Sequence, residues 1–130
     1  MMKILVICTG NTCRSPIAMG LLTGREGIEV DSAGIYACGE PINPNASAVL
    51  LEEGIDLSSH VSKPVTKELF EDANLVLVME SAHKTMLKAL GYDCQKVKVL
   101  DIADPFGNDE ECYRKTFEKI KKALENALEA

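Results

Sequence analysis

The chain has 130 residues, which is enough for a single domain with its own hydrophobic core, and we assign residues 1–130 to one domain. Its formal net charge of −6 argues against nucleic acid and anionic membranes as partners, because both attract basic surfaces. The sequence has no apolar stretch of membrane-spanning length and no signal-peptide pattern, so we expect a cytoplasmic protein.

The distribution of cysteines supports the same prediction of a cytoplasmic protein. They are odd in number and scattered along the chain, at positions Cys8, Cys13, Cys38, Cys94 and Cys112. This distribution indicates reduced thiols rather than structural disulfides. The sequence contains no Cys-x2-Cys pair, and the two histidines lie far from any pair of cysteines, so we predict no metal site and no cofactor.

Apolar segments and helix signals alternate along the chain. Buried strands are predicted at 3–7, 28–33, 75–79 and 96–100. Helices are predicted at 16–25, from Asn43 or Asn45 to 53, over a short stretch opened by Thr66, from Ser81 to 90, and from Asp109 to about 128. Because strands alternate with helices, we predict an α/β fold with a single doubly wound, four-stranded parallel sheet flanked by helices.

The most informative stretch is the loop predicted after the first strand. It reads Cys8-Thr9-Gly10-Asn11-Thr12-Cys13-Arg14-Ser15 and runs into a helix, with Gly10 expected to supply the turn. Ligands of such sheets bind at the carboxyl ends of strands, and backbone N–H groups at a helix N-terminus attract anions. Arg14 adds a guanidinium fork for phosphate oxygens, so this segment is predicted to bind phosphate after strand 1.

Cys8 stands at the base of this loop. A thiol beside N–H donors and a guanidinium ionises readily, which predicts a nucleophile inside an anion site. The simpler interpretation is a buried cysteine that ends a strand, with Arg14 as a surface charge. The spacing of Cys8 and Arg14 alone does not decide between the two, whereas the strand–turn–helix context favours the nucleophile.

Asp104 is the candidate proton donor. It lies in an Asp-Pro pair after the fourth predicted strand, and that loop opens at the same sheet edge as the Cys8 loop. On the residues alone, a turn-forming Asp-Pro is the simpler interpretation.

Residues 6–16 resemble the active-site loop of the low-molecular-weight protein tyrosine phosphatases, and the resemblance continues along nearly the whole chain. It implies a phosphocysteine intermediate on Cys8, with Arg14 binding phosphate and Asp104 as general acid. It also implies that Asn11, Ser32 and His60 form a network that holds the loop, whereas on the residues alone His60 is more simply a solvated loop histidine. Ser15 is expected to donate to the Cys8 thiolate, although a helix cap is the alternative.

The resemblance implies phosphorylated proteins as partners and inorganic phosphate as product. Thr12 and Phe106 resemble the branch of the family that removes phosphate from arginine, and a polar wall suits a guanidinium better than a phenyl ring. Protein-tyrosine phosphatase is the alternative within the family. An arsenate reductase and a non-catalytic phosphate-binding module stay open as further alternatives, although reductases usually need more redox cysteines than Cys94 in the segment around 75–95.

Cys8 and Cys13 form a candidate redox pair. They are five positions apart in one loop, so peroxide is expected to link them reversibly instead of over-oxidising Cys8. The alternative is that Cys13 is a small buried residue. Cys38, Cys94 and Cys112 are expected to fill space or lie at the surface, and His83 receives no function from the sequence.

Overall fold

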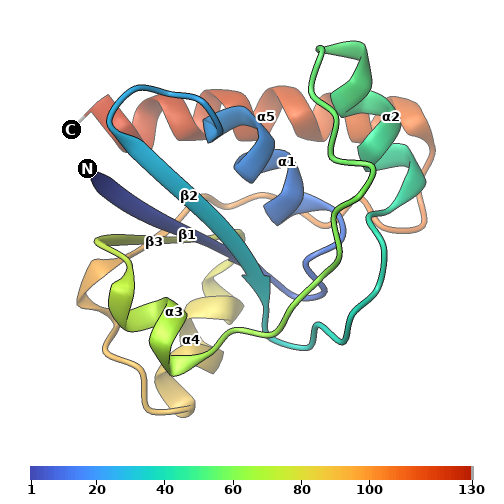
Figure 1. Cartoon of the computed structure of the whole chain (residues 1–130). Helices are drawn as coiled ribbons and strands as arrows, with labels where there is room; N and C mark the ends of the chain where they lie inside the picture. The colour runs from blue at the N-terminus through green and yellow to red at the C-terminus, as the bar shows by residue number, and fades with distance from the viewer. Residues whose placement is uncertain (130) are drawn as a thin grey trace.

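The computed structural model describes residues 1–129 and confirms the predicted sheet (Figure 1). Its four strands are all parallel and stand in the order β2-β1-β3-β4. The strands are β1 (Met2–Cys8), β2 (Ile28–Gly34), β3 (Leu75–Val78) and β4 (Val97–Val99). The central position of β1 places its carboxyl end, and therefore Cys8, between two neighbouring strands.

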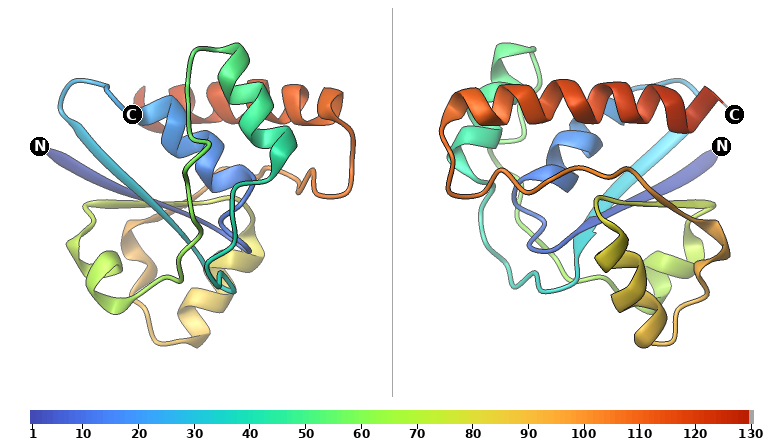
Figure 2. Two further views of the ribbon diagram at one scale, coloured as in Figure 1. Left: turned by 45° about the vertical axis from the view of Figure 1, so that its right-hand side comes forward. Right: turned by 180° about the vertical axis from the view of Figure 1, so that it is seen from behind.

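Helices cover both faces of the sheet, as the views in Figure 2 show. One face carries α1 (Arg14–Leu22), α2 (Pro44–Glu52) and α5 (Glu110–Glu129), and the other carries α3 (Lys67–Asp72) and α4 (Ser81–Ala89). A short 3-10 turn, η1 (Cys94–Lys96), leads into β4. None of the helices described within residues 1–129 is long and apolar enough to cross a membrane.

The alternation of side chains along β1 divides the core into two layers. Ile4, Val6 and Cys8 pack with α1, α2 and α5, whereas Leu5 and Ile7 pack with α3 and α4. All of them are buried, which explains the unbroken apolar run in the sequence. Cys8 is thus held by the core on one side while its loop opens at the edge of the sheet.

The structure decides which caps start the helices. Asn43 caps α2 and Thr66 caps α3, each through a side-chain oxygen that accepts a backbone N–H. Asp109 likewise accepts the N–H of Cys112 at the start of α5. The prediction of Ser81 as a cap is wrong: Glu80 is the N-cap of α4, and its backbone N–H donates to the ring of His83.

Several element boundaries also differ from the predictions, and those of α1 and β4 bear on the site. α1 begins at Arg14 rather than 16 and ends at Leu22, because Gly24 turns the chain with a φ of 86°. β4 begins at Val97 because the preceding residues form η1, whose first turn is capped by Asp93. The earlier start of α1 brings Arg14 into the first helical turn, directly behind the loop.

Candidate active site

Residues 9–13 connect β1 to α1, and all of them except Asn11 line a cavity of about 220 Å³ at the carboxyl edge of the sheet. The cavity is lined by Cys8, Thr9, Gly10, Thr12, Cys13, Arg14, Glu40, Asp104 and Phe106. All of these except Glu40 are among the site residues predicted from the sequence. The fold therefore brings together the loop after β1 and the loop after β4, as the parallel topology requires.

The left-handed residue of the loop is Asn11, with a φ of 57°, and not Gly10, from which the turn was expected. Asparagine adopts this conformation more readily than most residues, and here its polar groups are all engaged. Its side-chain amide donates to Ser15 Oγ (2.8 Å) and Ser32 Oγ (3.0 Å) and accepts the N–H of Lys63 (3.1 Å). The strained position is thus fixed by the network around it.

His60 and Ser32 complete this network. The Nε2 atom of His60 lies 2.9 Å from the carbonyl oxygen of Asn11, and Ser32 Oγ contacts Met19 Sδ at 3.3 Å. The structure therefore places Asn11, Ser15, Ser32 and His60 in one connected cluster beneath the loop. Ser15 lies inside α1 and does not cap it, which corrects the alternative considered for this residue.

The sulfur of Cys8 faces two hydrogen-bonding groups. Ser15 Oγ is 2.9 Å away, and the backbone N–H of Asn11 approaches at 3.3 Å. Because Ser15 Oγ already accepts the amide of Asn11, its own proton is free to point at the sulfur. Both groups can therefore donate to the Cys8 sulfur.

Arg14 is 2% exposed, and its guanidinium is held from one side. Its Nη1 atom donates to the carboxylate of Glu80 and, at 2.7 Å, to the carbonyl oxygen of Ile102. Its Nη2 atom lies 3.8 Å from a carboxylate oxygen of Asp104. This arrangement fixes the plane of the fork while Nε and Nη2 keep donor capacity for an anion in the cavity.

Asp104 combines the two interpretations considered for it. One carboxylate oxygen accepts the N–H of Phe106 at 3.0 Å, which makes the local turn, and the other faces Arg14. The side chain is 48% exposed, and it lines the cavity together with Cys8. Phe106 beside it is 69% exposed at the cavity mouth.

Gly34, at the end of β2, packs closely against the loop. A methyl group at this position would lie 2.7 Å from the carbonyl oxygen of Thr9 and 2.9 Å from the nitrogen of Asn11. The loop is also tied to this segment by the N–H groups of Ile35 and Tyr36, which donate to Cys8 and Thr9 at 3.1 and 2.9 Å. The absence of a side chain at Gly34 lets the loop rest against β2.

Three further residues at the site were not predicted. Glu80 binds Arg14, His83 binds Thr9, and Glu40 lines the cavity. The first two belong to the N-terminus of α4, whose position relative to the loop depends on the packing of that helix. The sequence signal for Glu40 is weak, because an exposed acidic residue in a loop is ordinary.

The proposed redox partners are both buried free thiols. Cys13 Sγ lies 3.4 Å from the hydroxyl of Tyr113, which is also buried. Burial raises the pKa of Cys13 above its ordinary value, so this thiol stays protonated near neutral pH. A disulfide between Cys8 and Cys13 stays a prediction, to be checked by mass spectrometry of peroxide-treated protein.

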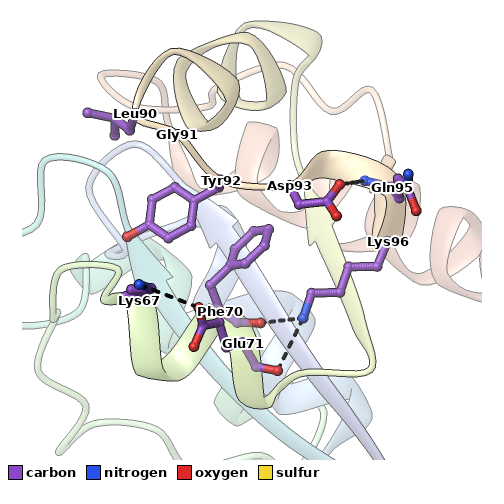
Figure 3. A pocket seen from close by; sticks show the side chains of 9 residues that line it. All are labelled: Lys67, Phe70, Glu71, Leu90, Gly91, Tyr92, Asp93, Gln95 and Lys96. Atoms are coloured by element: carbon purple, nitrogen blue, oxygen red, sulfur yellow. Dashed lines mark hydrogen bonds and ion pairs between the residues drawn. The ribbon is translucent and has the colours of Figure 1, made fainter.

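A second cavity, of about 770 Å³, lies at the opposite edge of the sheet, because its walls immediately precede β3 and β4 (Figure 3). Lys96 donates to the carbonyl oxygens of Phe70 and Ala73 at 2.6 Å each, which caps α3. The Phe70 ring packs on Tyr92 with centroids 4.7 Å apart. These contacts stabilise the fold. The lining of this cavity contains no cysteine, serine or histidine that could act as a nucleophile or base. Within residues 1–129, no group of three or more His, Cys, Asp or Glu side chains is arranged to hold a metal ion.

Comparison with known proteins agrees with this geometry. Residues 3–130 match the low molecular weight phosphotyrosine protein phosphatase family. A protein-arginine-phosphatase of Bacillus subtilis is 39% identical over 95% of this chain and 92% of its own length. The low molecular weight protein tyrosine phosphatase from T. tengcongensis has a TM-score of 0.93 at 34% identity, covering 99% of both chains.

One further solved structure bears on the chemistry. It is a mutant of the YwlE arginine phosphatase with a phosphorylated active-site serine, and it covers 97% of this chain and 93% of its own at 37% identity and a TM-score of 0.89. The similarity to these proteins, in sequence and in fold, extends over nearly the whole chain and is not confined to the loop. The chain belongs to the low molecular weight phosphotyrosine protein phosphatase family and is, through that membership, a cysteine-dependent protein phosphatase.

Proposed function

We propose that the chain is a protein-arginine phosphatase that works through a phosphocysteine on Cys8. The observation that carries the proposal is the chemistry of the cavity: two carboxyl groups, of Glu40 and Asp104, line it together with Cys8 and Thr12. A guanidinium is rich in N–H donors, so the oxygen atoms of Glu40, Asp104 and the Thr12 hydroxyl complement it as acceptors. The identities with protein-arginine-phosphatases support the same choice.

The first chemical step forms the S–P bond. The Cys8 thiolate attacks phosphorus while the loop N–H groups and Arg14 bind the phosphoryl oxygens. As the P–N bond breaks, Asp104 gives its proton to the leaving guanidine nitrogen. The phosphate-binding residues in this proposal are the loop residues Thr9, Gly10, Asn11, Thr12, Cys13, Arg14 and Ser15.

The second step releases phosphate. The Asp104 carboxylate, now without its proton, takes a proton from water as that water attacks the phosphocysteine. The S–P bond breaks and Cys8 leaves as a thiolate, which Ser15 stabilises through the contact of 2.9 Å. The cluster of Asn11, Ser32 and His60 keeps the loop in shape through both steps, and no cofactor is required.

Protein-tyrosine phosphatase activity is the second candidate function. An exposed aromatic side chain at the cavity mouth, Phe106, can pack against the ring of a tyrosyl group, although the same residue resembles the arginine branch of the family. The two activities differ only in which leaving group the mouth of the cavity prefers. We rank the arginine activity first because Glu40, Asp104 and Thr12 offer hydrogen-bond acceptors, which a guanidinium uses and a phenyl ring does not.

The deciding experiment measures kcat/KM on phosphoarginine and phosphotyrosine peptides of the same sequence. We expect the phosphoarginine peptide to be the better substrate. A clear preference for phosphotyrosine would replace the arginine assignment with the tyrosine one. Cys8→Ser is the control for mechanism: turnover is lost while inorganic phosphate still binds, because the anion site consists of the loop backbone and Arg14.

A further inference from the structure

His83 links α4 to the phosphate-binding loop across 74 positions of sequence. His83 is 3% exposed, and its Nε2 atom lies 2.8 Å from the hydroxyl of Thr9, the residue that follows the nucleophile. Its other ring nitrogen, Nδ1, lies 3.1 Å from the backbone nitrogen of Glu80. A buried imidazole with both nitrogens engaged has only one protonation state that satisfies these partners.

The backbone N–H of Glu80 is a donor, so Nδ1 of His83 must accept. The ring proton therefore sits on Nε2, which donates to the hydroxyl oxygen of Thr9. With that oxygen accepting, the hydroxyl proton of Thr9 is left to donate elsewhere, and Thr9 lines the same cavity as Cys8. A threonine oriented in this way supplies a hydrogen bond to a bound anion.

We propose that His83 is a positioning residue for the substrate phosphate: its neutral Nε2–H form turns the Thr9 hydroxyl into a phosphate donor. The proposal rests on the proposed function, since it assigns a further donor to the same phosphate site. His83 acts on the site by a second route as well. It holds the backbone of Glu80, whose carboxylate in turn holds Arg14, so Thr9 and Arg14 are both anchored through one ring.

The charges around His83 favour the neutral ring. Arg14 faces it from α1, Glu80 from the residue before α4, and Asp104 from the loop after β4. Burial, and then the charge of Arg14, lower the pKa of His83 below its ordinary value, while Glu80 and Asp104 oppose this effect more weakly. The ring is therefore neutral at pH 7. Protonation in acid removes the acceptor for Glu80, so phosphate binding is expected to weaken only at a pH below the range in which an ordinary imidazole titrates.

Two substitutions separate the contacts of the ring. In His83→Asn, the amide oxygen stands near the position of Nδ1 and keeps the bond from Glu80, but the side chain does not reach Thr9. In His83→Gln, the amide nitrogen reaches Thr9 and cannot titrate. Inorganic phosphate is the probe, and its inhibition constant is measured between pH 5 and 8 for both variants and for the wild type.

We expect His83→Asn to raise the inhibition constant of phosphate by about 3–10-fold, the range for one lost hydrogen bond. His83→Gln is expected to stay within about 3-fold of the wild type at pH 7 and to lose the weakening in acid that belongs to the imidazole. Lys88→Asn, at an exposed position of the same helix, is the matched control for effects on α4 itself.

Thr9→Val tests whether the effect passes through the hydroxyl. It should weaken phosphate binding to a similar degree, and His83→Asn added to Thr9→Val should weaken it little further. Additive losses, or an unchanged constant in His83→Asn, would overturn the proposal. Should the His83 variants unfold, nitrogen chemical shifts of the wild-type imidazole decide the question, because an Nδ1–H tautomer excludes the proposed orientation. If the wild type does not bind phosphate, the proposed function itself fails.

Discussion

At the scale of single residues, Asp104 carries the clearest prediction. Asp104→Asn should slow hydrolysis of substrates with poor leaving groups by about 10²–10⁴-fold, the usual range for the loss of a general acid. The substitution is nearly isosteric, and its amide oxygen can still accept the N–H of Phe106 that makes the local turn at 3.0 Å. The loop is thus expected to keep its conformation while it loses the proton.

The measurement compares two leaving groups on the same variant. A group that departs without protonation should lose far less rate than an arginine or tyrosine leaving group. Equal losses for both would mean that Asp104 serves only the turn and the charge of Arg14, which lies 3.8 Å away.

Thr12 is the residue whose substitution we expect to change substrate preference most. It lines the cavity, and its backbone carbonyl accepts the N–H of Asn43 at 2.9 Å, so the loop holds it in place independently of its side chain. Thr12→Ile removes the hydroxyl and adds apolar area. The ratio of kcat/KM for phosphoarginine over phosphotyrosine should fall about ten-fold, equivalent to about 1–2 kcal/mol.

Thr12→Val is the matched control for that change, because it keeps the shape of threonine and removes only the hydroxyl. If the hydroxyl recognises the guanidinium, Thr12→Val lowers the phosphoarginine rate without raising the phosphotyrosine rate. An unchanged substrate ratio in both variants would assign selectivity to other residues of the wall, with Glu40 and Phe106 next in line.

At the scale of elements, the site depends on how closely β2 approaches the loop after β1. Gly34→Ala should cost about 1–3 kcal/mol of folding free energy, because its methyl group overlaps the backbone of Thr9 and Asn11 at 2.7 and 2.9 Å. Neither backbone atom can move without shifting the loop. The kcat/KM of the folded protein should therefore fall by at least about ten-fold, since small displacements at a reacting centre are costly.

Gly24→Ala provides the comparison for Gly34→Ala. Gly24 has a φ of 86° in the turn after α1, and a methyl group there meets no atom within 4 Å. Alanine at this position costs about 1 kcal/mol through backbone strain alone, with the loop untouched. Thermal unfolding and kcat/KM of both variants then separate lost stability from lost geometry; full activity in Gly34→Ala would refute the close approach as a requirement.

The same scale explains what the sequence could predict. Features that depend on neighbouring residues could be predicted from the sequence. They are the strands, the loop motif and helix caps such as Asn43 and Thr66. Asp104 could be placed as well, because parallel topology brings the loop after β4 to the edge where β1 ends.

Residues whose roles depend on packing were not accessible in this way. His83 meets Thr9 only because α4 docks beside β3, and Glu80 meets Arg14 for the same reason. The prediction that Gly10 supplies the turn is wrong for a related reason. Asn11 adopts the left-handed conformation instead, because its contacts with Ser15, Ser32, Lys63 and His60 hold it there. No local propensity would select Asn11 over the adjacent Gly10.

At the scale of the whole molecule, net charge and site charge oppose each other. The chain carries a formal charge of −6, and the carboxylates of Glu40, Glu80 and Asp104 stand around a single buried guanidinium. Attraction for a phosphate anion is therefore local to the loop and Arg14, while the surrounding field repels anions. A substrate that carries positive charge next to its phosphate is attracted twice: the loop and Arg14 attract the phosphate, and the acidic surroundings attract the positive charge.

This balance predicts a preference for basic sequence around the phosphorylated residue. At low ionic strength, a phosphopeptide flanked by lysines should show a KM several-fold below that of a peptide flanked by glutamates, because the acidic surface attracts the first and repels the second. Raising the salt concentration to about 0.5 M should bring the two KM values together, since screening at that strength acts within a few ångströms. The kcat values should stay alike, because the flanking residues do not touch the reacting atoms. Equal KM values at low salt would show that the loop and Arg14 alone govern binding, and that the charge of the rest of the surface has no part in substrate choice.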